Sequence, residues 1–206
     1  GERVTGWNVL ATSLEGRRDA LLIALRPLAR FRPGGYRNVV VGQVEDVPAF
    51  LGTVRVALVT DPLLPTALAR LVPIELTLRF DPTDPIPGLV AAAAPLLDRL
   101  AAGSFFVRLE RRGLKGRLHS PTVEREIGDH VWKALEARGH TPRVDFADAD
   151  AVLLMPSLGD KAGLTVIDEV LILLSDFTSI IGAVLKDIGH GSLVARDLAG
   201  NTSGAV

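Results

Sequence analysis

The 206-residue chain contains no cysteine, one tyrosine and two tryptophans. The lack of cysteine excludes disulfides, thiolate zinc sites and cysteine nucleophiles. It also fits a reducing compartment, so we expect a cytoplasmic protein. The formal net charge is only −1, so any affinity for nucleic acid has to come from a local basic patch.

Long hydrophobic runs are scarce as well. The most apolar stretch, Val170 to Leu185, contains Asp176 and falls short of the roughly 18 to 20 clean apolar residues that a membrane span needs. The N-terminal sequence GERVTGWNVLATS lacks the continuous apolar core of a signal peptide. The sequence therefore predicts a soluble protein that has no membrane partner.

Strands and helices alternate in the first 80 residues. The apolar patterns predict strands at Trp7–Ser13, Asn38–Val44 and Pro73–Phe80. Leucines at helical spacing predict a helix in RRDALLIALRPLARF, and VPAFLGTVRV and PTALARLV suggest two short helices. This order is typical of an α+β domain of ferredoxin-like type.

The most proline-dense segment, Asp81–Gly88, is the predicted joint between domains. We expect a ferredoxin-like domain at 1–84, an α/β domain at 85–170, and an apolar helix with a frayed tail at 171–206. The second domain should contain a helix that ends near Gly103, a strand at Ser104–Arg112, a further helix, and strands in RVDF and AVLLM. The apolar helix could cover an exposed sheet or form a homodimer.

Five cations crowd the end of the predicted strand and the loop after it: Arg108, Arg111, Arg112, Lys115 and Arg117. Ser120 is the predicted N-cap of the next helix, with Pro121 at its first position. A helix N-terminus offers unpaired N–H groups to phosphate, and guanidinium groups bind phosphate in the same way. We therefore predict an RNA-binding set composed of Arg108, Arg111, Arg112, Lys115, Arg117, His119 and Ser120. The alternative is a solvated loop whose arginines pair with Glu110, Glu124 and Glu126.

These residues also resemble a known family. FFVRLERRGLKGRLHSPTVEREIGDHVWKALEARGHTPRVDFADADAVLLM is similar to the core of a THUMP domain, and the similarity extends over roughly Ala91 to Ile167. The matching positions are Phe106, Arg108, Arg111 and Arg112 in the strand, Ser120, Glu124 and Ile127 in the helix, and Val144, Asp145 and Phe146 in the "VDL" motif. Ala149 replaces the proline that usually follows this motif.

The resemblance implies a function and a partner. THUMP domains bind tRNA, usually near the acceptor end, and commonly follow a ferredoxin-like domain. Their companions include 4-thiouridine synthetases, RNA methyltransferases, deaminases and pseudouridine synthases. A stand-alone class serves as the adaptor of a tRNA cytidine acetyltransferase, and Pro73, Ile74 and Thr77 resemble that class. The resemblance thus implies a tRNA-binding adaptor that presents tRNA to a separate modification enzyme.

Signatures of catalysis are missing from the sequence. It has no P-loop, no SGGxDS adenylation motif and no [DN]PPY methyltransferase motif, and HSPTVE lacks the pattern of a zinc deaminase. The acids of VDFADADA favour strand and turn capping over a cation site. We therefore predict no catalytic residue, no cofactor and no metal. The alternatives are an RNA-modifying enzyme whose active site is unrecognised, and an α+β assembly protein that does not bind RNA.

Overall fold

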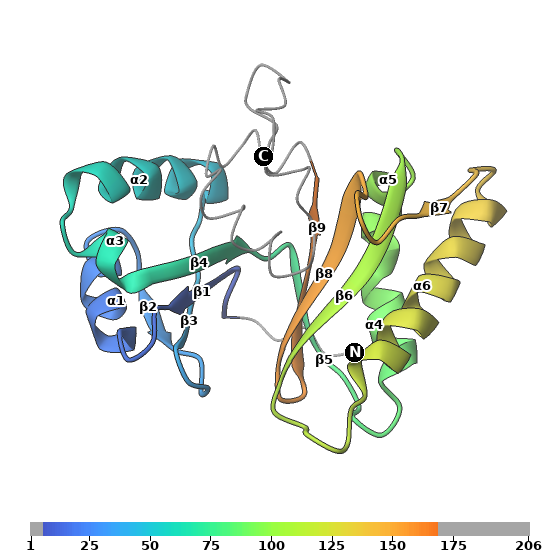
Figure 1. Ribbon diagram of the computed structural model, residues 1–206, viewed down its shortest axis with the longest axis horizontal. Coiled ribbons are helices and arrows are strands. Elements are labelled where there is room, and N and C mark those ends of the chain that lie inside the picture. The colour runs from blue at the N-terminus through green and yellow to red at the C-terminus, as the bar shows by residue number, and fades with distance from the viewer. Residues whose placement is uncertain (1–5, 169–206) are drawn as a thin grey trace. The chain divides into compact units, whose positions relative to one another are not determined.

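The computed structural model describes residues 6–168, which fall into two compact units. The N-terminal unit comprises residues 6–74, and the C-terminal unit begins at Glu75 and is described to residue 168. Both units combine helices with a sheet, so the α+β class is confirmed (Figure 1). The helix and tail expected at 171–206 lie outside the described residues.

The N-terminal unit contains a four-stranded sheet. Its elements are β1 (Val9–Ser13), α1 (Arg18–Leu25), β2 (Phe31–Pro33), β3 (Val39–Gly42), α2 (Val47–Thr60), α3 (Leu64–Ala67) and β4 (Leu68–Pro73). The strand order is β2-β3-β1-β4, and every neighbouring pair is antiparallel. β1 and β3 are nearly all buried, because apolar residues cover both faces of these central strands.

Two expectations for this unit are wrong. PTALARLV is helical only in α3, and its second half forms β4, which pairs with β1 from Ser13↔Leu68 to Val9↔Pro73. The helix predicted in RRDALLIALRPLARF is too long, because α1 ends at Leu25 and Phe31 begins the short strand β2. Its partner is β3, with Phe31 opposite Gly42. Pairing with another strand decides both cases, and for β4 that strand is distant along the chain.

The C-terminal unit contains a five-stranded mixed sheet. Its elements are β5 (Leu76–Arg79), α4 (Pro85–Ala93), the 3-10 turn η1 (Ala94–Leu96), α5 (Leu97–Leu100), β6 (Ser104–Arg112), α6 (Ser120–Ala137), β7 (Arg143–Val144), β8 (Ala151–Leu158) and β9 (Lys161–Ile167). The strand order is β5-β9-β8-β6-β7. β6 runs parallel to β7 and β8, whereas β9 is antiparallel to β5 and β8.

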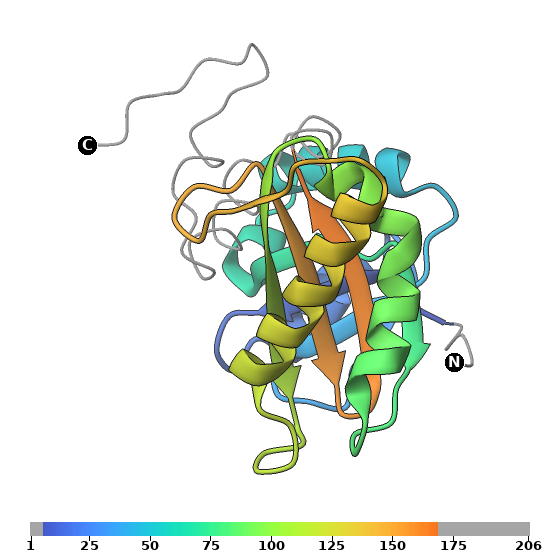
Figure 2. The same ribbon diagram turned by 90° about the vertical axis from the view of Figure 1, so that its right-hand side faces the viewer.

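α4 and α6 lie on one face of this sheet (Figure 2). The buried face of α6 consists of Val123, Ile127, Val131 and Leu135, as its apolar spacing predicts. These side chains join a core with sheet residues such as Phe105, Leu153 and Val166. Each is at most 5% exposed, so burial of apolar surface fixes α6 against the sheet.

The predicted joint at Asp81–Gly88, with its boundary between residues 84 and 85, is misplaced. β5 pairs with β9 from Leu76↔Leu164 to Arg79↔Lys161, so the division falls between Ile74 and Glu75. The proline-rich segment lies inside the C-terminal unit, where residues 81–84 form a turn and residues 85–88 form the start of α4. Hydrogen bonds from Thr83 to the Asp81 carboxylate hold this turn and lower the pKa of Asp81. No helix within residues 6–168 has both the length and the apolarity to cross a membrane.

Candidate nucleic-acid interface

β6 and α6 bring the predicted RNA-binding residues together at one end of the C-terminal unit. The loop between them is tight, because Gly113, Leu114 and Gly116 all have positive φ angles, of 80°, 53° and 77°. The Leu114 carbonyl accepts hydrogen bonds of 3.0 Å from the N–H groups of Arg117 and Leu118. Leu118 is buried in the core and anchors the loop. The basic segment is therefore an ordered turn that leads directly into α6.

Four of the seven predicted residues line one open pocket. Its volume is about 360 Å³, and its lining consists of Arg111, Gly116, Arg117, Leu118, His119, Ser120 and Pro121. Arg111 Nη1 donates to the Gly113 carbonyl, which fixes the guanidinium beside the loop. A Cβ added at Gly116 would meet no atom within 4 Å, so the backbone there is open to a ligand. Two guanidinium groups and the positive end of α6 thus surround one space.

The other predicted cations lie outside this pocket. Arg108 Nη1 lies 3.8 Å from Glu124 Oε1, and the Arg108 guanidinium carbon lies 5.9 Å from the centre of the Phe106 ring. Arg112 Nη2 lies 3.9 Å from Glu110 Oε2, and the Arg112 side chain is only 19% exposed. Lys115 is exposed on the loop. Pairing with Glu110 and Glu124, which the sequence left as an alternative, thus occurs for two of the arginines.

Glu124 also completes the open edge of β6. β7 pairs only with Ser104 and Phe105, so within residues 6–168 β6 has no neighbouring strand on that side from Phe106 onward. The N–H of Leu109 donates instead to Glu124 Oε1 at 2.8 Å. One carboxylate therefore ties α6 to β6 and lies beside Arg108 at the same time.

The predicted cap of α6 is one residue too late. His119 is the N-cap, and its Nδ1 accepts a hydrogen bond from the Thr122 N–H at 3.3 Å. Ser120 is the first residue of the helix, and Pro121 the second. The ring nitrogen of a histidine can accept the hydrogen bond that a serine hydroxyl usually accepts at an N-cap. The known N-cap preference for serine, threonine, aspartate and asparagine does not predict a histidine there. His119 therefore shapes the pocket and starts the helix.

The acidic loop VDFADADA caps backbone groups, as the sequence predicts. Asp145 Oδ1 accepts from the N–H groups of Ala147 and Asp148 at 2.8 and 2.9 Å. Asp150 Oδ2 accepts from the Ser104 N–H at 2.8 Å and from its hydroxyl at 3.0 Å. These carboxylates thereby stabilise the turn that leads into β8.

Phe146 is a further candidate for RNA binding. The sequence analysis placed it in the "VDL" motif but not in the RNA-binding set. Its side chain is 71% exposed, and the centre of its ring lies 5.9 Å from that of Phe106. An exposed aromatic ring can stack on an unpaired RNA base. An aromatic residue beside a strand is more often buried, so its position in the sequence gave no sign of this exposure.

No protein-family model and no curated protein matches the sequence. Among solved structures, TrmN from Thermus thermophilus is 26% identical, with a TM-score of 0.53, over 77% of this chain and 44% of TrmN. PH1313 from Pyrococcus horikoshii Ot3 is 11% identical, with a TM-score of 0.55, over 77% of this chain and 53% of that protein. A 4-thiouridine synthetase solved with RNA and ATP is 12% identical, with a TM-score of 0.49, over 77% of this chain and 40% of the synthetase.

The chain thus spans about half, or less, of the length of these structures. The likeness to PH1313 concerns the fold alone, at 11% identity. The likeness to TrmN supports the relation to THUMP-containing tRNA-modification proteins that the sequence indicates.

Proposed function

We propose that the C-terminal unit binds tRNA and that the chain presents this tRNA to a modification enzyme. The supporting observation is the pocket at the start of α6, where Arg111, Arg117 and His119 surround the N-terminus of an 18-residue helix. Phosphate oxygens suit this arrangement, because guanidinium forks and helix N–H groups both donate hydrogen bonds to anions. Lys115 adds an exposed cation on the same loop.

Cytidine acetylation is the reaction that we infer for the partner enzyme. Pro73, Ile74 and Thr77 carry the resemblance to the stand-alone adaptors. Pro73 ends β4, and Thr77 lies in β5, where it pairs with Gly163. In this role the chain would act by positioning, since holding a substrate beside a catalytic group removes much of the entropic cost of their encounter.

The N-terminal unit fits the ferredoxin-like domain that commonly precedes a THUMP domain. Its order of elements is β-α-β-β-α-α-β, and each of the two βαβ connections has another strand inserted between its strands. Such connections are typical of the split βαβ arrangement, which supports a ferredoxin-like domain here. We include that domain in the proposal.

Binding of labelled tRNA at several salt concentrations tests the proposal. The variant Arg111→Ala/Arg117→Ala removes two pocket cations, and the log–log salt slope should fall by about 0.7 to 0.9 for each phosphate that the variant no longer neutralises. The control is Lys133→Ala/Arg138→Ala, which removes two exposed cations that lie about 20 and 27 Å from the start of α6, the second of them paired with Asp98. Equal slopes for the two variants would refute a phosphate site in this pocket.

A second experiment tests the adaptor role. The purified chain is incubated with tRNA, acetyl-CoA, ATP and S-adenosylmethionine, and the nucleosides are examined by mass spectrometry. We expect unmodified tRNA, because the sequence offers no site for these cofactors. A modified nucleoside formed without another protein would favour the enzyme alternative.

A further inference from the structure

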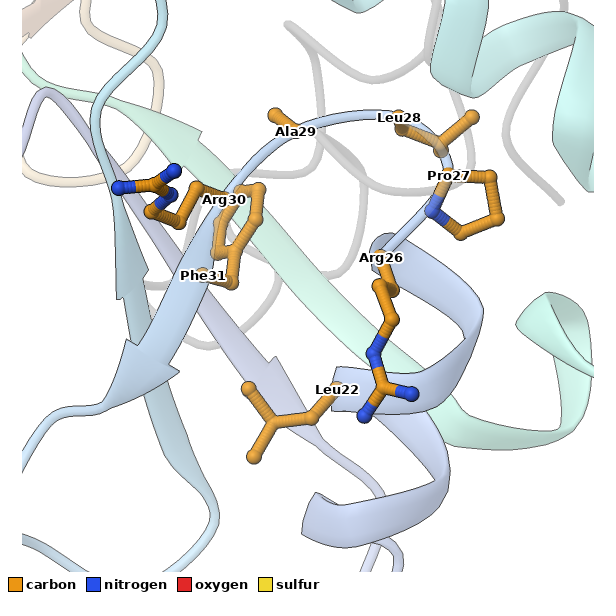
Figure 3. A pocket seen from close by; sticks show the side chains of 7 residues that line it. All are labelled: Leu22, Arg26, Pro27, Leu28, Ala29, Arg30 and Phe31. Atoms are coloured by element: carbon orange, nitrogen blue, oxygen red, sulfur yellow. The ribbon is translucent and has the colours of Figure 1, made fainter.

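A second basic surface lies on the N-terminal unit, in the loop between α1 and β2. A pocket of about 490 Å³ is lined there by Leu22, Arg26, Pro27, Leu28, Ala29, Arg30 and Phe31. Figure 3 shows Leu22 and Arg26 across the pocket from Arg30 and Phe31, with the chain from Pro27 to Ala29 arching between them. This volume lies in the range of about 300 to 1,000 Å³ that small-ligand pockets occupy.

The cations of this surface have no carboxylate partner in the part of the chain that the structure describes. Within residues 6–168, Arg26, Arg30 and the adjacent Arg32 form no ion pair, and all three are exposed. By contrast, Arg18 pairs with Asp19 at 3.2 Å, and Arg37 pairs with Glu15. Residues 6–74 contain eight arginines, no lysine and five acidic residues, so this unit carries a positive formal charge.

The backbone of the loop leaves the Arg26 guanidinium without a local acceptor. Pro27 follows the C-cap of α1, and the Arg26 N–H donates to the carbonyls of Leu22 and Ile23. The Leu25 carbonyl accepts from Leu28 and Ala29 at 2.9 and 3.1 Å. The Arg26 guanidinium makes no hydrogen bond within residues 6–168, so an external anion can be its acceptor.

Phe31 gives the pocket an aromatic wall whose position is fixed. A Cβ added at Gly42, its cross-strand partner, would lie 2.8 Å from the Phe31 ring, so the ring packs directly on the β3 backbone. The ring centre also lies 5.8 Å from that of Phe50 in α2. Phe31 remains half-buried, and the pocket is the space beside it.

We propose that this pocket is a second RNA contact, which binds a flexible segment through its phosphates at Arg26 and Arg30 and through a base at Phe31. Arginine forks match phosphate oxygens, and a base stacks on an aromatic face whatever its identity. The inference rests on the proposed function, since it assigns an additional surface to the same RNA partner.

Two double variants test this contact by tRNA binding at several salt concentrations. Arg26→Ala/Arg30→Ala should lower the salt slope by about 0.7 to 0.9 for each phosphate that these arginines neutralise in the unaltered chain. Arg18→Ala/Arg37→Ala removes the same charge from the same unit and should leave the slope unchanged. Ultraviolet cross-linking adds a readout, because Phe31→Leu keeps the apolar packing and should abolish a cross-link located by mass spectrometry in residues 26–32.

The outcomes separate the two proposals. If the full chain fails to bind tRNA, both proposals fail. If the chain binds, and Arg111→Ala/Arg117→Ala weakens binding while Arg26→Ala/Arg30→Ala behaves like its control, the second contact alone is overturned. Cross-links confined to residues 108–120 would also overturn it.

Discussion

The two units of this chain differ in how far carboxylates neutralise their arginines. The C-terminal unit contains fourteen acidic and twelve basic residues between positions 75 and 168, and carboxylates pair with Arg99, Arg108, Arg112, Arg138 and Arg143. The N-terminal unit has fewer cations, yet Arg26, Arg30 and Arg32 have no carboxylate partner within the described residues. A cluster of cations in the sequence therefore does not show which of them can bind a ligand. The fold determines which cations lie beside a carboxylate and which do not.

The largest loss of stability should follow from a cavity beneath α6, the helix that carries the C-terminal candidate site. Ile127 is fully buried on the face of α6, the helix that also carries Glu124 and follows His119. Ile127→Ala leaves a cavity in the core and should lower the free energy of unfolding by about 2 to 5 kcal/mol. Urea titration followed by circular dichroism measures this change.

Val59 in α2 supplies the control, because its side chain is 86% exposed. Val59→Ala should change the free energy of unfolding by less than about 0.5 kcal/mol. Similar losses for the two variants would contradict the assignment of Ile127 to the core.

The next largest effect should be a difference in stability between the loss of a paired arginine and the loss of an unpaired one. Arg99 Nε donates to Asp168 at 2.9 Å, Nη2 donates to the Val166 carbonyl at 2.9 Å, and Nη1 donates to Glu75. Burial lowers the pKa of Arg99, but the hydrogen bond to Asp168 and the charge of Glu75 outweigh it and raise the pKa overall. Arg99→Ala leaves two carboxylates without this donor and should cost about 1 to 3 kcal/mol of stability.

Arg26→Ala in the N-terminal unit is the matched comparison, since it removes an exposed arginine that has no carboxylate partner in the described residues. Its effect on the midpoint of urea unfolding should be close to zero. A loss as large as that of Arg99→Ala would mean that Arg26 has a structural partner, and the contrast between the units would fail.

Local patterns predicted most of the C-terminal unit. Ser104–Arg112 was expected as a strand and forms β6, whose first residues are apolar and aromatic and which a glycine follows. The buried face of α6 followed from its apolar spacing. Pairings between distant segments could not be predicted this way. β5 joins β9, nearly ninety residues later, so a dense cluster of prolines was mistaken for the joint.

The residues of the candidate site were predictable from the sequence, but which of its arginines pair with carboxylates was not. The sequence identified every cation between Arg108 and Arg117, and it named Glu110 and Glu124 as possible partners. It could not show that Arg111 and Arg117 line a pocket while Arg112 is mostly covered, because the twist of β6 and the turn at Leu114 decide which side chains face solvent. The pocket at Arg26 and Arg30 gave no signal, since two arginines around Pro27 form no recognisable motif.

A smaller effect should distinguish the two residues at the start of α6. His119→Ala removes the acceptor for the Thr122 N–H, so we expect a loss of about 1 kcal/mol in the free energy of unfolding. Ser120→Ala should cost less than about 0.5 kcal/mol, because alanine is well tolerated at the first helical position. Thermal unfolding of both variants measures the difference, and the reverse order would restore Ser120 as the cap.

The smallest expected change in stability comes from removing the ion pair between Arg108 and Glu124. Glu124→Gln keeps an oxygen that can accept from the Leu109 N–H, but it removes the charge beside Arg108. An ion pair at the surface is worth about 0.2 to 1 kcal/mol, and this pair is partly exposed, so the stability should fall by about this amount. If Arg108 is then free to pair with an RNA phosphate instead, the same energy should strengthen tRNA binding by up to about fivefold.

Glu136→Gln is the control, because it removes an equal charge from an exposed site on α6 and measures the general attraction between the chain and RNA. If both variants strengthen binding equally, Arg108 makes no direct contact with RNA, and its role is confined to its ion pair with Glu124.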